Sequence, residues 1–319
     1  MRKSVRVITC EERKQRFINA FSNQIDVDHI NDLTDGAYSH NSLLAMGKDW
    51  NLFCEFCDSK SVRSLPAAAT AVRLFIEKES KSRKYSTIKR YVVTISLVHR
   101  LLSLPDPVSS VSVRNTLAAL RINKKHDSHS TNAFNRQHLD ELTLLLHKSK
   151  NSKDIRNLAI YHIMFECMLK RSELRDLMLE SVYSHDARYY VVVGSQEYQL
   201  SVESSQLLKR WLEVRGDCSG ALFTAIDKYG NLSRNALNDS SIYRILRAAS
   251  DKLMLDVHFS GQSLRVGAAS DLASQGVKVK EIQRYGRWKS AAMPYQYVGN
   301  RSQAALERMV YKSFKPWDK

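Results

Sequence analysis

The chain is poor in the residues that interrupt helices. Its 319 residues include only 11 Gly and 5 Pro. Intrinsically disordered and collagen-like chains need an excess of Pro, Gly or Ser, so both classes are excluded. The apolar fraction of 43% suffices for buried cores, and the length suits two domains because one domain takes roughly 100–200 residues. We expect two compact, mainly helical domains.

Long hydrophobic runs are also missing. The most apolar run, Leu158 to Leu169, has about a dozen residues, whereas a membrane span needs roughly 20. The basic N-terminus, MRKSVRVITCEERK, has too short an apolar stretch for a signal peptide. The sequence therefore predicts no membrane partner and a cytoplasmic location, where its five Cys stay reduced.

Complete motifs for metals and nucleotide cofactors are absent as well. Cys54-Glu-Phe-Cys57 has the spacing of half a zinc site or a redox pair, but no second Cys or His pair completes it. Its place in an amphipathic pattern favours two buried structural thiols. No Gly-rich loop of the phosphate- or dinucleotide-binding kind occurs. We expect neither a metal nor a cofactor.

Basic residues are present in excess. The 49 Lys and Arg outnumber the 33 Asp and Glu, which gives a net charge of +16. Such a surplus attracts a polyanion or an anionic membrane surface. The membrane alternative is weaker, because no Lys- and Arg-faced amphipathic helix with a large apolar face stands out.

Apolar residues recur at helical spacing through the first 120 residues. The first stripe reads Leu43, Met46, Trp50, Phe53 and Cys57. Its steps of three and four predict a helix over 41–57. Similar stripes predict helices over 66–75, 88–102 and 113–120. The segment 122–132 then has no apolar period and clusters Lys, His, Ser and Asn, so we predict a basic linker between an all-helical domain at 1–121 and a second domain at 133–319.

The second domain is predicted to be mixed but mostly helical. Residues 188–193 and 197–202 are rich in β-branched and aromatic side chains around a short turn, which predicts a hairpin and one small antiparallel sheet. The remaining periodic segments predict helices over 137–146, 155–169, from 204, and over 240–253, 263–275, 279–284 and 302–313.

Short motifs then follow one another in a fixed order. Near the C-terminus these are Gln262-Ser-Leu-Arg265, Gly286-Arg-Trp288 and, nine residues after that Trp, Tyr297. An earlier block reads Met168-Leu-Lys-Arg-Ser-Glu-Leu174, followed by Leu177. In this order and spacing the chain resembles the tyrosine site-specific recombinases, the phage integrase family, and within it the Cre-like branch.

The resemblance implies an all-helical core-binding domain that clamps DNA and a catalytic domain that breaks and rejoins it. Breaking a DNA strand without a metal requires a hydroxyl nucleophile and cations that bind the phosphate oxygens. By resemblance, Tyr297 is the nucleophile that forms a 3′-phosphotyrosyl link and Arg265 is a phosphate clamp. Trp288 supports the phosphate, and Glu173 is a supporting carboxylate.

Three of the six expected functional positions differ from the family pattern. Lys170 stands where the family has an Arg, and Arg171 does not simply replace it, because one step along a helix rotates a side chain by about 100°. Gln262 stands where the family has a His, and an amide cannot transfer a proton. The turn of the predicted hairpin lacks the family's Lys. The resemblance therefore leaves two functions open: a site-specific recombinase, and a recombinase-fold DNA-binding protein that cuts little or not at all.

The implied partners are double-stranded DNA and further copies of the chain. Arg121, Lys124 and Lys125 are candidate contacts to the DNA backbone. The resemblance also implies a dimer to tetramer on DNA, assembled through the C-terminal helix that carries Leu306 and Met309. It places the protein with nucleoid, plasmid or phage DNA.

Overall fold

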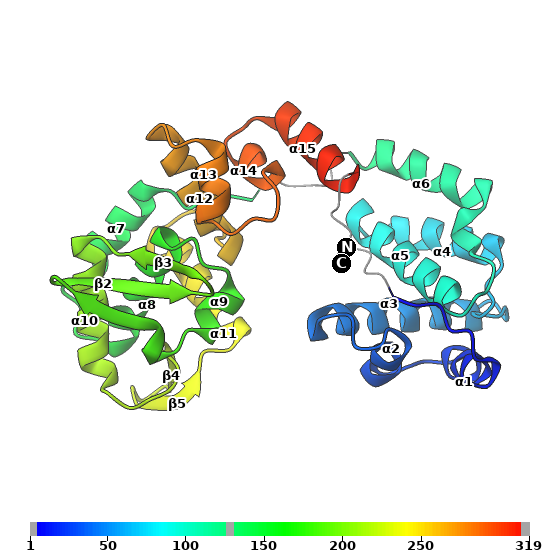
Figure 1. Ribbon diagram of the computed structural model, residues 1–319, viewed down its shortest axis with the longest axis horizontal. Helices are drawn as coiled ribbons and strands as arrows, with labels where there is room; N and C mark the ends of the chain where they lie inside the picture. The colour runs from blue at the N-terminus through cyan, green and yellow to red at the C-terminus, as the bar shows by residue number, and fades with distance from the viewer. Residues whose placement is uncertain (1–4, 126–130, 314–319) are drawn as a thin grey trace. The chain divides into compact units, whose positions relative to one another are not determined.

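The computed structural model describes residues 5–125 and 131–313, with side chains through residue 310. The chain forms two compact units, Met1–His129 and Ser130–Lys319, and each is described by itself (Figure 1). Both units are mainly helical, and the second also holds small antiparallel sheets. The expected fold class is confirmed. Among the described residues, no helix is long and apolar enough to cross a membrane.

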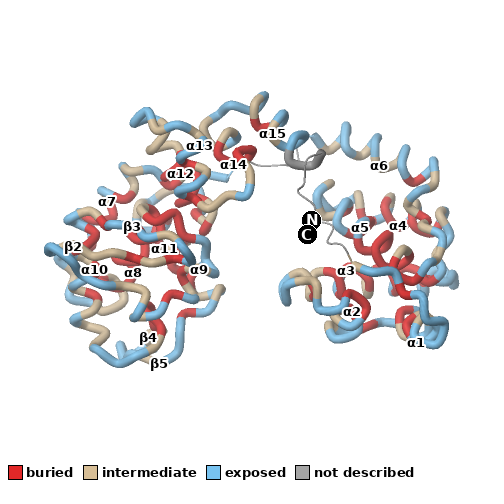
Figure 2. The backbone as a smooth tube through the Cα atoms, in the orientation of Figure 1, coloured by how far each residue is buried: buried red, intermediate tan, exposed pale blue. Residues whose placement is uncertain are grey.

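Helices pack around one apolar core in the first unit. Its elements are α1 (Glu11–Phe21), α2 (Val27–Leu33), α3 (His40–Asp58), α4 (Ala69–Ser80), α5 (Tyr85–Leu101), a short 3-10 turn (Pro107–Ser109) and α6 (Val111–Asn123). Trp50, Phe53 and Phe75 are fully buried, and their rings meet edge to face with centroids 5.9 and 5.2 Å apart. These aromatic pairs come from the predicted stripes, and Figure 2 shows the buried segments of α3, α4 and α5 facing one another.

The helix at the end of the first unit extends into the predicted linker. α6 continues through Asn123, and the Lys124 N–H closes its last turn on the Leu120 carbonyl at 2.9 Å. Ile122 is 73% exposed, so the apolar period is lost although the helix goes on. No Gly or Pro interrupts it there. The helix therefore continues two residues into the segment 122–132 that the sequence predicts as a linker, and residues 126–130 of that segment lie outside the described part.

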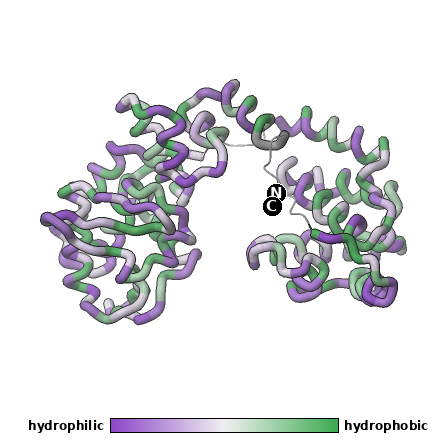
Figure 3. Tube along the Cα trace, viewed as in Figure 1, coloured by the Kyte–Doolittle hydropathy of each residue, from purple (hydrophilic) through white to green (hydrophobic). Residues whose placement is uncertain are grey.

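The second unit surrounds a buried helix. Its helices are α7 (Arg136–Leu146), α8 (Ser152–Glu166), α9 (Arg171–Asp176), α10 (Val202–Arg215), α11 (Asp239–Lys252), α12 (Gly261–Ser274), α13 (Val279–Tyr285), α14 (Ala292–Tyr297) and α15 (Arg301–Ser313), with a 3-10 turn at Leu179–Ser181. Every residue of α8 from Ile155 to Phe165 is buried, as its nearly all-round apolar pattern predicts. Polar and apolar residues alternate along most other helices (Figure 3), which is the pattern of helices with one solvated face.

The predicted hairpin is part of a three-stranded antiparallel sheet. Its strands are β1 (Val182–His185), β2 (Arg188–Val193) and β3 (Gln196–Gln199), in the order β1-β2-β3. β3 ends at Gln199, earlier than predicted, because the Ser201 side chain caps α10 and Val202 begins that helix. A second pair, β4 (Thr224–Ile226) and β5 (Leu232–Ala236), was not predicted.

α8 ends at Glu166, three residues before its predicted end. Met168 takes a left-handed backbone with φ +47°, and the Leu169 N–H bonds to the Met164 carbonyl at 3.1 Å. This is a common helix-ending loop, although glycine usually holds its left-handed position. The loop matters for the site below, because it turns the carbonyl of Met168 toward two arginines.

Candidate active site

Four of the predicted residues meet in the second unit. Gln262 and Arg265 lie three residues apart in the first turns of α12, so they share one face of the helix. Trp288 follows α13, and Tyr297 is the last residue of α14. The Gln262 side-chain amide donates a hydrogen bond to the Tyr297 hydroxyl, and the Tyr297 ring lies edge to face on Trp288 at 5.7 Å.

The guanidinium of Arg265 is buried and held from two sides. It is 2% exposed and lies over the Trp288 ring, 4.3 Å from the ring centroid. Its Nη1 donates to the Met168 carbonyl and its Nη2 to the Gly286 carbonyl, the latter at 2.6 Å. A guanidinium has five N–H groups, so about three remain for a ligand. Burial, with Arg287 nearby, lowers the pKa of Arg265 to about 10, which leaves it charged at neutral pH.

Gly286 is required by the packing of the neighbouring Trp. A Cβ at position 286 would lie 2.0 Å from the Trp288 ring, so any other residue would displace the ring from its place between Arg265 and Tyr297. The glycine of the Gly286-Arg-Trp288 motif thus has a steric reason.

Tyr297 is held as a neutral phenol. Burial raises its pKa, although the charges of Arg265 and Arg308 pull it down. Its own backbone carbonyl accepts a hydrogen bond from the Ser270 hydroxyl at 3.2 Å. Tyr297 is therefore held at its hydroxyl and at its backbone, and the hydroxyl must lose its proton if it is to attack a phosphorus atom.

Glu173 and Lys170 form a pair at the start of α9. The Glu173 carboxylate accepts from both the backbone N–H and the side-chain ammonium of Lys170, each at 2.8 Å. It also accepts from Arg287, at 3.2 Å from Nε and 2.7 Å from Nη2. Burial alone would raise the pKa of Glu173, but the hydrogen bonds from Arg287 and Lys170 outweigh it and bring the pKa to about 2. The carboxylate is ionised at neutral pH.

Helix geometry does not describe how the side chains of Lys170 and Arg171 are related, because α9 begins between these two residues. Lys170 is the extended residue before α9 and Arg171 is the first helical one, so the rotation of about 100° between helical neighbours does not apply to them. The stem of Arg171 runs past Gly261, where a Cβ would lie 2.5 Å from its Cγ. Arg171 is exposed, and no hydrogen bond or ion pair within residues 5–125 and 131–313 uses its guanidinium.

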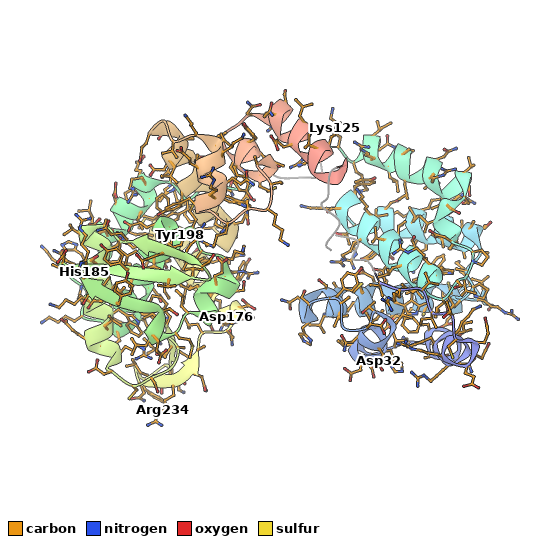
Figure 4. All side chains as sticks on the ribbon, in the orientation of Figure 1. Asp32, Lys125, Asp176, His185, Tyr198 and Arg234 are labelled. Carbon is orange, nitrogen blue, oxygen red and sulfur yellow. The ribbon has the colours of Figure 1, made fainter. Side chains whose placement is uncertain are left out.

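Arg287 and Tyr198 are site residues that sequence reasoning missed. Arg287 is the middle residue of the Gly286-Arg-Trp288 motif, and its guanidinium points back to Glu173. Tyr198 lies on β3 of the predicted hairpin (Figure 4), and its hydroxyl accepts from Arg287 and donates to the Tyr285 carbonyl at 2.6 Å. The strands and turns from 182 to 199 contain no Lys. The available signal was Tyr198 itself, an aromatic residue in a strand whose other residues are Gln and Glu.

The remaining candidates lie in the first unit. Arg121 is exposed in the last turn of α6, Lys124 follows that helix, and Lys125 is exposed beside it. Cys54 and Cys57 are buried free thiols, and burial raises their pKa values to about 11 and 12. Across the part of the chain that the structure describes, no three His, Cys, Asp or Glu side chains are grouped as metal ligands.

Known proteins share both the sequence pattern and the fold. The chain is 26% identical to the Cre recombinase of Escherichia phage P1, over 81% of this chain and 82% of that one. It is 27% identical to an integrase/recombinase XerD homolog of Selenomonas ruminantium, over 85% and 86% of the two chains.

Solved structures extend the likeness to the fold. XerH recombinase bound to a palindromic difH substrate has a TM-score of 0.63 at 13% identity, over 98% of this chain and 90% of that one. A λ integrase dimer bound to a core site has a TM-score of 0.60 at 13% identity, over 98% and 80%. Residues 135–304 match the phage integrase family. Because this match spans more than half of the sequence, the chain belongs to the phage integrase family.

Proposed function

We propose that this protein recombines DNA at specific sites by breaking and rejoining strands through Tyr297. Membership in the phage integrase family implies this class of function. The observation that carries the proposal is the grouping of a hydroxyl nucleophile, Tyr297, with the buried cation Arg265. Trp288 contacts both of them.

The proposed step exchanges one phosphate ester for another. The Tyr297 oxygen attacks the phosphorus atom, a P–O bond to Tyr297 forms, and the bond from phosphorus to the 5′-oxygen breaks. The phenolic proton passes to water, and the leaving 5′-oxygen takes a proton from water. Gln262 directs the hydroxyl by its hydrogen bond but transfers no proton, because an amide does not ionise.

Positive charge at the site supports the reaction. Negative charge builds on the phosphate oxygens as the new bond forms, and fixed donors stabilise that state more than the bound substrate. Arg265 supplies a guanidinium, which fits two phosphate oxygens at once. Lys170, about half exposed beside Glu173, supplies a second cation that has no bidentate geometry.

Double-stranded DNA and a second copy of the chain are the proposed partners. The first unit serves as a core-binding domain, with Arg121, Lys124 and Lys125 on the DNA backbone. α15 presents Leu306, at 55% exposure, and Met309, at 65%. We assign this apolar stripe to a neighbouring protomer in a dimer or tetramer on nucleoid, plasmid or phage DNA.

A second candidate is a DNA-binding protein with little or no cleavage. Two observations favour it: Gln262 cannot serve as an acid or base, and the hairpin from 182 to 199 offers no Lys as an acid for the leaving oxygen. A missing general acid costs about 10²–10⁴ in rate. Both candidates predict DNA binding, and they differ in whether a covalent intermediate forms.

A nicked duplex separates the two candidates. The purified protein is incubated with a pool of duplexes whose sequence is randomised around one central nick, so that a short fragment diffuses away after cleavage and traps the intermediate. We expect a DNA band attached to protein on a denaturing gel and a mobility shift on a native gel. Tyr297→Phe should abolish the first and keep the second. A mobility shift with no covalent band for the wild type would establish the binding protein instead.

A further inference from the structure

Arg287 occupies a backbone position that glycine normally holds. It follows the end of α13 with φ +56°, its N–H bonds to the Arg284 carbonyl, and the Trp288 N–H bonds to the Gln283 carbonyl, both at 3.0 Å. In this helix-ending loop glycine is preferred, because a Cβ is crowded at left-handed backbone angles. A long charged side chain kept at such a position points to a role for that side chain.

The guanidinium of Arg287 is fully engaged by the protein. Its Nε and Nη2 bind the two oxygens of Glu173, and Nη2 also donates to the Met168 carbonyl at 3.0 Å. Its Nη1 donates to the Cys167 carbonyl at 3.1 Å and to the Tyr198 hydroxyl. These contacts use all five N–H groups of the side chain, so Arg287 has none left for a DNA phosphate.

These contacts lead directly to Arg265. The Met168 carbonyl accepts from both Arg287 and Arg265. The other acceptor of Arg265 is the carbonyl of Gly286, the residue that precedes Arg287 in the chain. Both carbonyls that fix the Arg265 guanidinium are therefore set by the loop and the side chain of Arg287.

The charges of the cluster match a phosphate that gains negative charge. Arg265, Arg287 and Lys170 are cations, and Glu173 is a single carboxylate between them. Glu173 lets the two guanidinium groups lie close together, because it offsets part of their repulsion. The excess of positive charge favours the more negative transition state over the bound diester.

We propose that Arg287 is a positioning residue for DNA cleavage, which holds Glu173 and the Met168 carbonyl in place, orients Arg265 through them and adds a second, partly buried positive charge. The inference rests on the proposed function. Position 170 carries Lys where the family has Arg, and Arg287, in the turn after α13, supplies further positive charge near the site.

Arg287→Gly tests the side chain without straining the backbone, because glycine adopts the left-handed angle freely. On a duplex selected from the nicked pool, we expect the rate of covalent-complex formation at saturating DNA to fall about 10²-fold. The dissociation constant for DNA should stay within about twofold, since Arg287 has no free donor. Arg287→Lys should recover about tenfold of the lost rate, because it restores the charge.

A matched control exists in the same unit. Met254 follows the end of α11 in the same kind of loop, with φ +53°, and it is 94% exposed. Met254→Gly should leave the cleavage rate unchanged and report what the backbone change alone does to the melting temperature. A wild-type cleavage rate in Arg287→Gly, or an Arg287→Lys variant as slow as Arg287→Gly, would overturn the proposal.

A measurement without DNA separates this inference from the proposed function. The pKa of the Glu173 carboxyl is followed by ¹³C NMR in the full chain, with Glu173→Gln to assign the signal. We expect a pKa of about 2 in the wild type and a higher pKa in Arg287→Gly, where burial is opposed by Lys170 and Arg265 alone. An unchanged pKa would show that Arg287 does not hold the carboxylate, whether or not the protein cleaves DNA.

Discussion

The residues of the site predict how its chemistry can be strengthened. Lys170→Arg combined with Gln262→His introduces a bidentate phosphate donor and a group that titrates near neutral pH. Neither change adds a contact to a base edge, so we expect DNA affinity to change little. Cleavage of a nicked duplex should rise by up to about 10²-fold per restored function.

Rates of covalent-complex formation for the two single variants and the double variant check this prediction. Tyr297→Phe in the double variant should remove the covalent complex while leaving the mobility shift. A double variant that cleaves more slowly than a measurably active wild type would mean that Lys170 and Gln262 belong to a differently arranged working site.

Among the residues of the site, the sequence identified those that lie at a fixed spacing within a short motif. Gln262 and Arg265 share a helix face, and Trp288 and Tyr297 lie nine residues apart in one short segment. Arg287 escaped because its partner Glu173 is 114 residues away, and because nothing local marks an Arg that replaces glycine in a left-handed turn. Arg171 was misplaced because the start of α9 could not be located from a six-residue helix.

Among the elements, α7, α8 and α10 are joined by a buried polar network that makes stability depend on pH. His162 is fully buried, and its ring lies 2.8 Å from both the Thr143 and the Ser204 hydroxyls. Ser204 in turn donates to Glu166 at 2.7 Å. Burial, with the charge of Arg136, lowers the pKa of His162 from 6.5 to about 3, so the imidazole is neutral in the folded protein.

The sign of the pH effect follows from proton binding. Between pH 6.5 and 3 the unfolded chain binds a proton at His162 that the folded chain excludes. Stability is therefore lost as the pH falls through this range, by at most about 1.4 kcal/mol per pH unit. We expect His162→Gln, which does not titrate, to flatten the dependence of the melting temperature on pH between 7 and 5.

Circular dichroism melts of both proteins measure this dependence. His258 is exposed, so His258→Gln is the matched control and should keep the wild-type slope. Equal slopes for wild type and His162→Gln would contradict a buried neutral His162.

The role proposed for α15 predicts how changes to this helix affect the assembly of several protomers on DNA. Deleting residues 301–319 should leave binding to a single DNA site largely intact and abolish complexes on paired sites. The deletion also removes Ala304, which is 2% exposed, so a milder variant is needed. Replacing Leu306, Met309 and Val310 by Ser alters only exposed side chains, and native gels with one-site and two-site DNA should show the same loss of the larger complexes. If these complexes persist in both variants, α15 serves its own protomer.

Long, strongly periodic elements were predictable from the sequence, and short ones were not. The stripe over 41–57 became α3, because its apolar side chains fill one core. α9 and α14 have six residues each, too few for a period to be recognised. β4 has only three residues, and β5 is exposed along most of its length, so neither strand shows a clear alternation of buried and exposed residues.

At the scale of the whole molecule, the excess of positive charge predicts that DNA binding depends strongly on salt. A protein that neutralises DNA phosphates releases counterions, so its affinity falls with salt. With a net charge of +16, we expect nanomolar to micromolar binding to its duplex and a loss of roughly 10³-fold or more between 50 and 200 mM salt if about six phosphates are contacted. Fluorescence anisotropy across this range gives the slope, and a flat response would remove the electrostatic argument.

Identification of the residue that bears the DNA tests the central claim most directly. The covalent complex formed on nicked duplex is digested with nuclease and trypsin, which releases the peptide 290–301 with Tyr295 and Tyr297 as its two hydroxyl-bearing aromatic residues. We predict that fragmentation by mass spectrometry places the nucleotide on Tyr297, and that Tyr295→Phe forms the same complex. A nucleotide on Tyr295 or on another peptide would contradict the account.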